Sequence, residues 1–73
     1  MAEKPNELTK LVTIATDLQL AAKLRINAIE QLGSLGTHDA LLALLDLAAN
    51  TGLIRAEREL ALKQAREIIK SGD

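Results

Sequence analysis

The sequence predicts an all-α fold of two stacked antiparallel helical hairpins, four helices in total. Three observations predict it: a segment that repeats itself at an offset of 33 residues, a composition rich in helix-forming residues, and apolar residues spaced three and four apart between glycine-containing breaks. The repeat is the strongest of the three, because a period of about 20 to 50 residues is typical of stacked repeat architectures.

The internal repeat covers residues 8–68 without a gap. Several residues are identical at this offset, namely Leu8/Leu41, Leu11/Leu44, Ala15/Ala48, Leu20/Leu53, Arg25/Arg58, Ala28/Ala61 and Gln31/Gln64. Each unit is expected to form one helical hairpin, and a single hairpin of this kind cannot bury its apolar face alone. The two hairpins are therefore expected to lean on each other.

The chain has 73 residues, of which 48% are apolar and 26% charged, and this suits one small domain. We expect a disordered N-terminal tail at residues 1–5 and a single helical domain at 6–73, with repeat one at about 6–38 and repeat two at about 39–71. The chain has no cysteine and no aromatic residue, so the core must consist of aliphatic side chains. No apolar run reaches the roughly 18 residues of a membrane span, and the N-terminus lacks a signal-peptide core, which predicts a cytoplasmic protein.

The first helix is expected to begin with Asn6 as its N-cap and to end near Asp17. Its apolar face is formed by Leu8, Leu11, Val12 and Ala15, and its other face by Thr9, Thr13 and Thr16. Asp17 or a neighbour is expected to cap the second helix, at about residues 20–34. Gly33 and Gly36 then break the helical pattern.

Thr37 is the expected N-cap of the third helix, at roughly residues 38–49. Residues 50–52, Asn-Thr-Gly, predict the next turn. The fourth helix is expected at about residues 53–70, with a lysine at its negative end.

Arg25 and Arg58 are the charged residues that disagree with the apolar pattern. Each falls inside the apolar arc of its helix, at the same place in both repeats. A guanidinium tolerates such a site when its stem lies on apolar surface and its head meets a carboxylate or helix-end carbonyls. We therefore expect two semi-buried, paired structural arginines, with Asp17, Asp46 and Asn50 as the nearest partners by topology.

Residues 24–50, LRINAIEQLGSLGTHDALLALLDLAAN, resemble a HEAT-type repeat: an apolar residue and arginine, alanine three positions after the arginine, then a leucine-glycine break. The second unit departs from this pattern with Glu57 at the apolar position and Arg66 at the glycine. It keeps Arg58, Ala61 and Leu62. The resemblance implies a short HEAT-like α-solenoid that serves as a scaffold for protein partners, with the arginine bonded to an acidic residue near the inter-helix turn. Tetratricopeptide repeats have a similar period, but their aromatic positions have no counterpart here.

The two units differ where the last helix gains charge. Residues 22, 24 and 26 of the first unit are apolar, whereas the second unit has Arg55, Glu57 and Glu59 at the equivalent positions. A terminal repeat typically ends a stack by presenting a polar outer face. We therefore expect these three side chains to be exposed, and the threonine face of the first helix to close the other end.

His38 and Asp39 are the only adjacent pair that resembles catalytic groups, and their position indicates a helix N-terminus instead. Proton transfer would need a second positioned group and a substrate pocket. A lone histidine is also a poor zinc site, since zinc takes three or four ligands. The sequence therefore predicts no enzyme, no catalytic residue, no metal and no cofactor.

The third helix is apolar almost all round, with Asp46 as its only charge past the first turn. In a two-layer array one side of it should stay in contact with water, and Leu42 and Ala49 lie nearest Asp46 on the helix. Two interpretations of this candidate surface stay open. Leu42 is an ordinary exposed leucine, or Leu42, Asp46 and Ala49 form a patch for a protein partner or for a second copy in a homodimer.

The predicted function is a non-enzymatic protein–protein interaction or scaffold module. The alternative is a small helical nucleic-acid-associated regulator, because the last helix carries five cations. A net charge of −1 and carboxylates interleaved with those cations argue against nucleic acid as a partner. Affinity for a duplex at two salt concentrations would separate the two functions, since phosphate contacts give a steep salt dependence.

Overall fold

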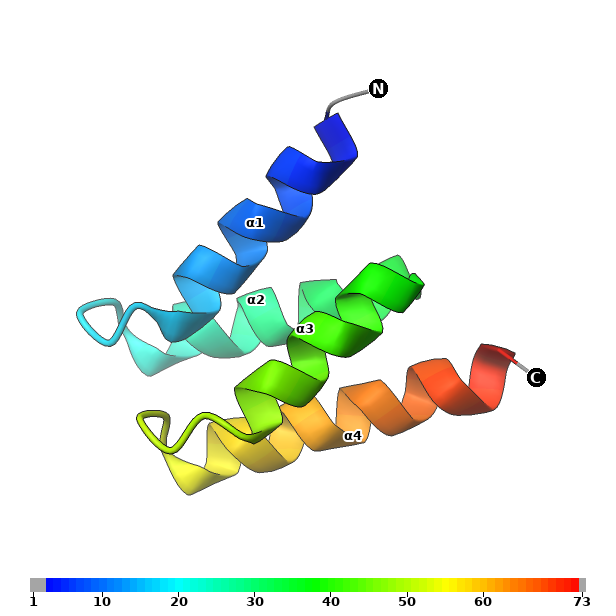
Figure 1. The fold of residues 1–73 in the computed structure, drawn as a ribbon. Coiled ribbons are helices and arrows are strands. Elements are labelled where there is room, and N and C mark those ends of the chain that lie inside the picture. Colours follow the sequence, from blue (N-terminus) through cyan, green and yellow to red (C-terminus); the bar gives the residue numbers. More distant parts are fainter. Residues whose placement is uncertain (1–2, 73) are drawn as a thin grey trace.

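The computed structural model describes residues 3–72, with side chains for residues 7–71. It contains four helices, α1 (Glu3–Thr16), α2 (Ala22–Leu35), α3 (His38–Ala48) and α4 (Arg55–Gly72) (Figure 1). No strand occurs within the described range. The first two helices form hairpin one and the last two form hairpin two, so the predicted all-α fold of two helical hairpins is confirmed.

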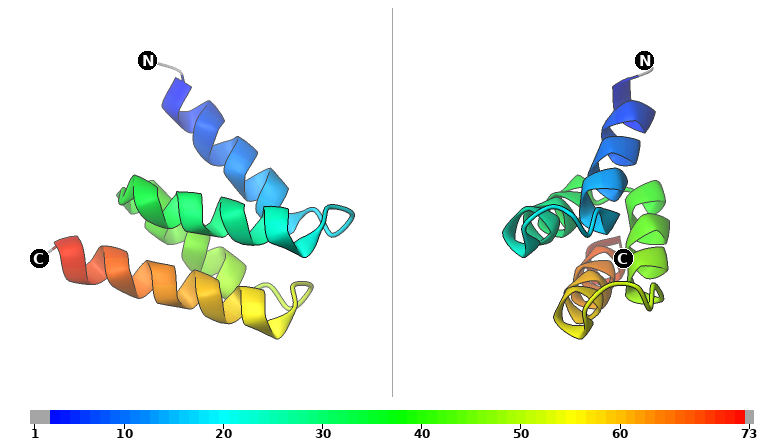
Figure 2. Two further views of the ribbon diagram at one scale, coloured as in Figure 1. Left: turned by 180° about the vertical axis from the view of Figure 1, so that it is seen from behind. Right: turned by 90° about the vertical axis from the view of Figure 1, so that its left-hand side faces the viewer.

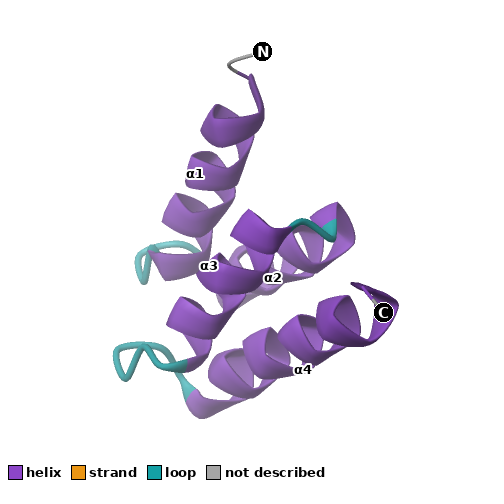
Figure 3. Ribbon diagram, turned by 45° about the vertical axis from the view of Figure 1, so that its right-hand side comes forward, coloured by secondary structure: helices purple, strands orange, loops and turns teal. Residues whose placement is uncertain are grey.

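The helices form two layers, with α1 and α3 in one layer and α2 and α4 in the other (Figure 2, right). Within the hairpins, α1 packs on α2 and α3 packs on α4, and the contact of α2 with α4 is the largest between the hairpins. The loops within the two hairpins, residues 17–21 and 49–54, lie at the same end of the molecule (Figure 3). The chain thus repeats one supersecondary unit side by side.

The core consists of aliphatic side chains from all four helices and one loop. Its buried members are Ala15, Ala28, Ile29, Leu32, Ala40, Leu44, Leu47, Leu53, Ala61, Ala65 and Ile68. Many of them are alanines, and small side chains allow helix backbones to approach each other closely. The predicted aliphatic core is confirmed, and its burial supplies most of the stability of helices that would be marginal alone.

The two loops repeat each other in their hydrogen bonds. The Oδ1 atom of Asp17 accepts a hydrogen bond from the backbone N–H of Gln19 at 3.0 Å, and Oδ1 of Asn50 accepts one from Gly52 at 2.8 Å. The backbone carbonyls of Asp17 and Asn50 each accept a hydrogen bond from the residue three positions later, at 3.1 Å in both loops. The offset of 33 residues therefore holds in the turn geometry as well as in the apolar pattern.

The start of α1 differs from the prediction. The helix begins at Glu3, so residues 3–5 of the predicted tail are helical, while residues 1 and 2 lie outside the described part of the chain. Asn6 is consequently inside the helix and is not its N-cap. Pro5 is tolerated in this first turn because backbone N–H groups there have no intrahelical acceptor.

The N-cap of α2 also differs from the prediction. The capping residue is Ala21, which provides no side-chain hydrogen bond, and α2 begins at Ala22. Asp17 does not cap α2, because its carboxylate is used within the loop by the N–H of Gln19. The N-terminus of α2 therefore gains no stability from a side-chain cap, and the stability of the helix depends on packing.

Only one of the two predicted glycine breaks ends a helix. Gly36 is the C-cap of α2 and has a φ of 65°, the left-handed region that glycine adopts without steric cost. Gly33 lies inside α2, where a Cβ atom would overlap the side-chain amide of Gln64 on α4. The sequence signal at Gly33 thus reflects the close approach of α4 and not a helix end.

The helices of hairpin two agree more closely with the prediction. Thr37 is the N-cap of α3 as predicted, and its hydroxyl oxygen accepts a hydrogen bond from the N–H of Ala40 at 3.1 Å. The helix ends at Ala48, one residue early. Leu53, the predicted first residue of the fourth helix, is buried in the loop instead. The helix α4 begins at Arg55, two residues later than predicted.

Replacing Thr37 with alanine is expected to lower the free energy of unfolding by about 1 kcal/mol, because it removes the acceptor for one N–H of the first turn of α3. Urea unfolding followed by far-UV circular dichroism measures the change. Thr51→Ala, an exposed site in the loop 49–54, is the matched control and is expected to change stability by less than about 0.5 kcal/mol. Equal effects at both threonines would contradict the capping role.

Candidate functional site

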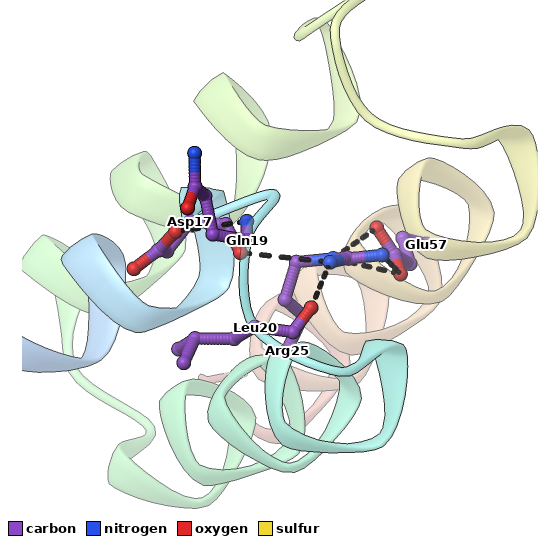
Figure 4. Close-up of polar contacts among 5 residues, drawn as sticks. All are labelled: Asp17, Gln19, Leu20, Arg25 and Glu57. Carbon is purple, nitrogen blue, oxygen red and sulfur yellow. Dashed lines mark hydrogen bonds and ion pairs between the residues drawn. The ribbon is translucent and has the colours of Figure 1, made fainter.

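Arg25 is buried on α2, and its guanidinium extends to a carboxylate on α4 (Figure 4). Nε of Arg25 donates to both oxygens of Glu57, at 3.1 Å to Oε1 and 3.0 Å to Oε2, and Nη2 lies 2.9 Å from Oε2. This geometry satisfies the planar donor fork of arginine in the way that bidentate arginine–carboxylate pairs do. The pair joins hairpin one to hairpin two.

The other side of the guanidinium faces the loop of hairpin one. Nη1 donates to the carbonyl of Leu20 at 2.7 Å and to the carbonyl of Asp17 at 3.5 Å. Asp17 directly follows the last residue of α1, and carbonyls at a helix C-terminus carry partial negative charge. Arg25 thus connects three parts of the fold, namely its own helix, the end of α1 and α4.

The predicted burial and pairing of Arg25 are confirmed, but its partner was predicted wrongly. Among the three residues proposed from topology, Asp17 contributes a backbone carbonyl and not its carboxylate. Asp46 is exposed on α3, and Asn50 bonds within its own loop. The carboxylate comes from the second repeat, through a contact between α2 and α4 that the local pattern did not indicate.

Glu57 was expected on an exposed outer face together with Arg55 and Glu59, and this is wrong for Glu57, which is 0% exposed. Arg55 and Glu59 are exposed as predicted and form an ion pair at 3.0 Å. Residues two apart on an α-helix lie about 200° apart, whereas residues four apart lie about 40° apart. The helical wheel of α4 therefore separates Glu57 from the face that Arg55 and Glu59 share.

Arg58 occupies in hairpin two the position that Arg25 occupies in hairpin one. It is only partly buried, yet its Nε atom is buried and has no hydrogen-bond partner among the described residues. The prediction that Arg58 is paired like Arg25 is therefore wrong at this atom. The difference arises because hairpin two covers Arg25 and no described part of the chain covers Arg58 in the same way.

A pocket of about 190 Å³ lies beside Arg58 and spans α3 and α4. Its lining consists of Ala48, Arg55, Arg58, Glu59 and Leu62. Three of these residues correspond, at the offset of 33, to the buried Ala15, Arg25 and Ile29 of hairpin one, whereas Arg55 corresponds to the exposed Ala22 and Glu59 to the half-buried Ile26. The pocket thus overlaps, at Ala48, Arg58 and Leu62, with the part of hairpin two that corresponds to the covered face of hairpin one.

The predicted candidate surface on α3 is exposed. Leu42, Asp46 and Ala49 lie along one side of the helix, and Leu42 has 49% of its surface exposed. Leu45, which the prediction did not include, is exposed on the same side. The structure therefore brings Leu42, Asp46 and Ala49 together on one side of α3, while Arg25 and Arg58 lie on separate helices.

The predicted polar closure of the array holds only in part. Thr9 and Thr13 of α1 are exposed, as expected for a polar end of hairpin one. However, Ile14 and Leu24 of the same hairpin are exposed as well, and Leu62 is exposed on hairpin two. Both hairpins therefore expose aliphatic side chains as well as polar groups.

Few groups in the described residues suggest catalysis or metal binding. His38 and Asp39 are exposed at the start of α3, where the sequence placed a helix N-terminus. Within residues 3–72, no group of three or more His, Cys, Asp or Glu side chains is arranged to hold a metal ion. In the same range, no helix has both the length and the apolar character needed to cross a membrane.

Comparison of the sequence with protein-family models gave no match, and neither did comparisons with curated proteins and with solved structures. The HEAT-type resemblance therefore stays a prediction.

Proposed function

We propose that this chain is a non-enzymatic protein-interaction module in which two HEAT-like hairpins present helix faces to a protein partner. One observation carries the proposal: hairpin two exposes an aliphatic side chain, Leu62, at a position that is covered in hairpin one. Leu62 is 38% exposed, whereas Ile29, its equivalent at the offset of 33, is 0% exposed. An aliphatic side chain that is exposed where its equivalent in the other repeat is buried provides an apolar contact for another protein.

The proposed binding surface, here called the hairpin-two face, consists of Leu42, Leu45, Ala48, Arg58 and Leu62. The three residues of α3 follow each other at a spacing of three, so they are neighbours along the helix. Ala48 and Leu62 line the same pocket, which joins this row to α4. An aliphatic centre with arginine beside it matches the composition of protein interfaces, in which apolar residues and arginine are favoured over lysine and glutamate.

A second copy of the chain is one partner that this surface can serve, and it gives a direct prediction. If Leu42 lies in a homodimer interface, Leu42→Lys should lower the mass measured by light scattering from two chains to one, because a desolvated lysine is costly there. Helicity by far-UV circular dichroism should be unchanged, since Leu42 is not part of the core. An unmodified protein that is monomeric at high concentration would exclude the homodimer.

A different protein as partner is tested by capture with three baits, each the full-length chain. The unmodified chain and Leu24→Lys are expected to retain the same protein from a host extract, and Leu42→Lys is expected to lose it. Leu24 is the matched control because it is 48% exposed, close to the 49% of Leu42, but lies on α2 of hairpin one. Equal capture by all three baits would show that the hairpin-two face is not the binding surface.

A further inference from the structure

We propose that the pocket at Arg58 binds the carboxylate of a glutamate side chain that a protein partner presents from a helix. This inference rests on the proposed function and names the chemistry of the partner. The partner helix would pack on α4 as α4 itself packs on α2.

The chain contains its own precedent for this contact. At the equivalent place in hairpin one, Arg25 holds Glu57 through Nε and Nη2, and both side chains are buried. Arg58 has the same residue type at the same offset, and the loops before both arginines have the same hydrogen bonds. The backbone of the loop before the arginine is therefore repeated, whereas the hydrogen bonds of Arg25 to the carbonyls of Asp17 and Leu20 have no counterpart at Arg58 among the described residues, and neither has the carboxylate.

The chemistry of the pocket selects for a carboxylate. Nε of Arg58 is buried and donates to no acceptor among the described residues, so an apolar side chain placed over it would leave that donor unsatisfied. The other cation of the pocket, Arg55, already pairs with Glu59 at 3.0 Å. Ala48 and Leu62 supply apolar walls that strengthen a charge-assisted hydrogen bond by excluding water.

A second copy stacked head to tail does not supply this carboxylate. In such a stack, hairpin one of the next copy would cover hairpin two as hairpin two covers hairpin one. The residue that takes the place of Glu57 would then be Leu24, which lies 33 positions before it. The apolar side chain at that position argues for a different protein as the occupant.

The first arm of the test asks whether a carboxylate binds at Arg58. Propionate, which has the chemistry of a glutamate side chain, is titrated into the full-length chain labelled with ¹⁵N, and propionamide is the neutral control. The arginine Nε–H resonances report the contact. A saturable shift is expected at Arg58 with propionate alone, and a smaller one at the exposed Arg55. Parallel, unsaturable shifts at both arginines would overturn the proposal.

The second arm asks whether the carboxylate has to come from a helix. The probe is the full-length chain with Leu24→Glu, which provides the missing carboxylate, and with Arg58→Gln, which prevents the probe from stacking on itself. The matched control carries Leu24→Gln and Arg58→Gln. Binding of the control to the unmodified chain is expected to be at least roughly 30-fold weaker, the low end for losing one partner of a buried charge pair.

When the chain that binds the probes carries Arg58→Gln as well, it should no longer prefer the Leu24→Glu probe over the Leu24→Gln control. Equal affinity of both probes would overturn the proposal. So would a saturable propionate shift without binding of either probe, because the pocket would then serve a small carboxylate and not a helix. Neither result affects the capture experiment with Leu42→Lys, so failure of this inference is distinguishable from failure of the proposed function.

Discussion

Replacing Glu57 with leucine is expected to lower the free energy of unfolding by about 3 to 5 kcal/mol, because it leaves the buried Arg25 guanidinium without its counterion. Small domains have about 0.05 to 0.15 kcal/mol of stability per residue, so this loss is a large share of the total for 73 residues. The variant should lie close to the midpoint of unfolding in water. Far-UV circular dichroism in urea is the suitable measurement, since the chain has no aromatic residue for fluorescence.

The double variant Arg25→Met with Glu57→Leu provides the control for this prediction. Replacing both members of a buried ion pair with apolar residues of similar size is often close to neutral, so most of the lost stability should return. Leucine is also the residue that the first repeat has at the equivalent position, Leu24. If Glu57→Leu alone unfolds at the same urea concentration as the unmodified chain, the ion pair does not stabilise the fold.

Residues 1–38 as a separate fragment are expected to be largely unfolded. The fragment contains hairpin one, whose Ile29 and Leu32 have no exposed surface in the full chain. Its helices α1 and α2 have 14 residues each, and isolated helices of this length are marginal in water. Arg25 would also lose Glu57, which lies beyond the cut. The far-UV circular dichroism of this fragment should therefore show little helix.

Mixing fragments 1–38 and 39–73 should restore helicity, because each provides the surface that the other lacks. A first fragment that carries Arg25→Ala is the control, and it should restore less helix at the same concentration since the contact with Glu57 is missing. A first fragment that folds cooperatively by itself would show that the hairpins do not depend on each other. The HEAT-like interpretation would then have to be withdrawn.

The secondary structure of this chain was largely predictable because its signals are local. The spacing of apolar residues, the cap at Thr37 and the left-handed glycine at Gly36 each act within a few residues, and the structure places them as expected. Gly33 looked like a further helix end but lies inside α2. A glycine fits at this position because a Cβ atom there would overlap the side chain of Gln64 on α4, which is distant in sequence.

The partner of Arg25 and the pocket at Arg58 were not predictable in the same way. Burial of Arg25 followed from its own helical wheel, but its contact with Glu57 depends on how α4 lies against α2. The wheel of α4 separates Glu57 from Arg55, and this would have excluded a common exposed face. The exposure of Leu42 was predictable because it concerns one helix, whereas the pocket depends on the packing of two.

The ion pair between Arg25 and Glu57 also has a consequence for alignment between the hairpins. Contacts made by alanine and aliphatic residues at helical spacing discriminate weakly between alignments, since sliding α4 along α2 by one turn, about 5.4 Å, would bring Ala65 to the place of Ala61. The same slide would separate the two charges and leave both buried without a partner, at a cost of several kcal/mol. We therefore expect this single polar contact to select one register from several that the aliphatic surface alone would tolerate.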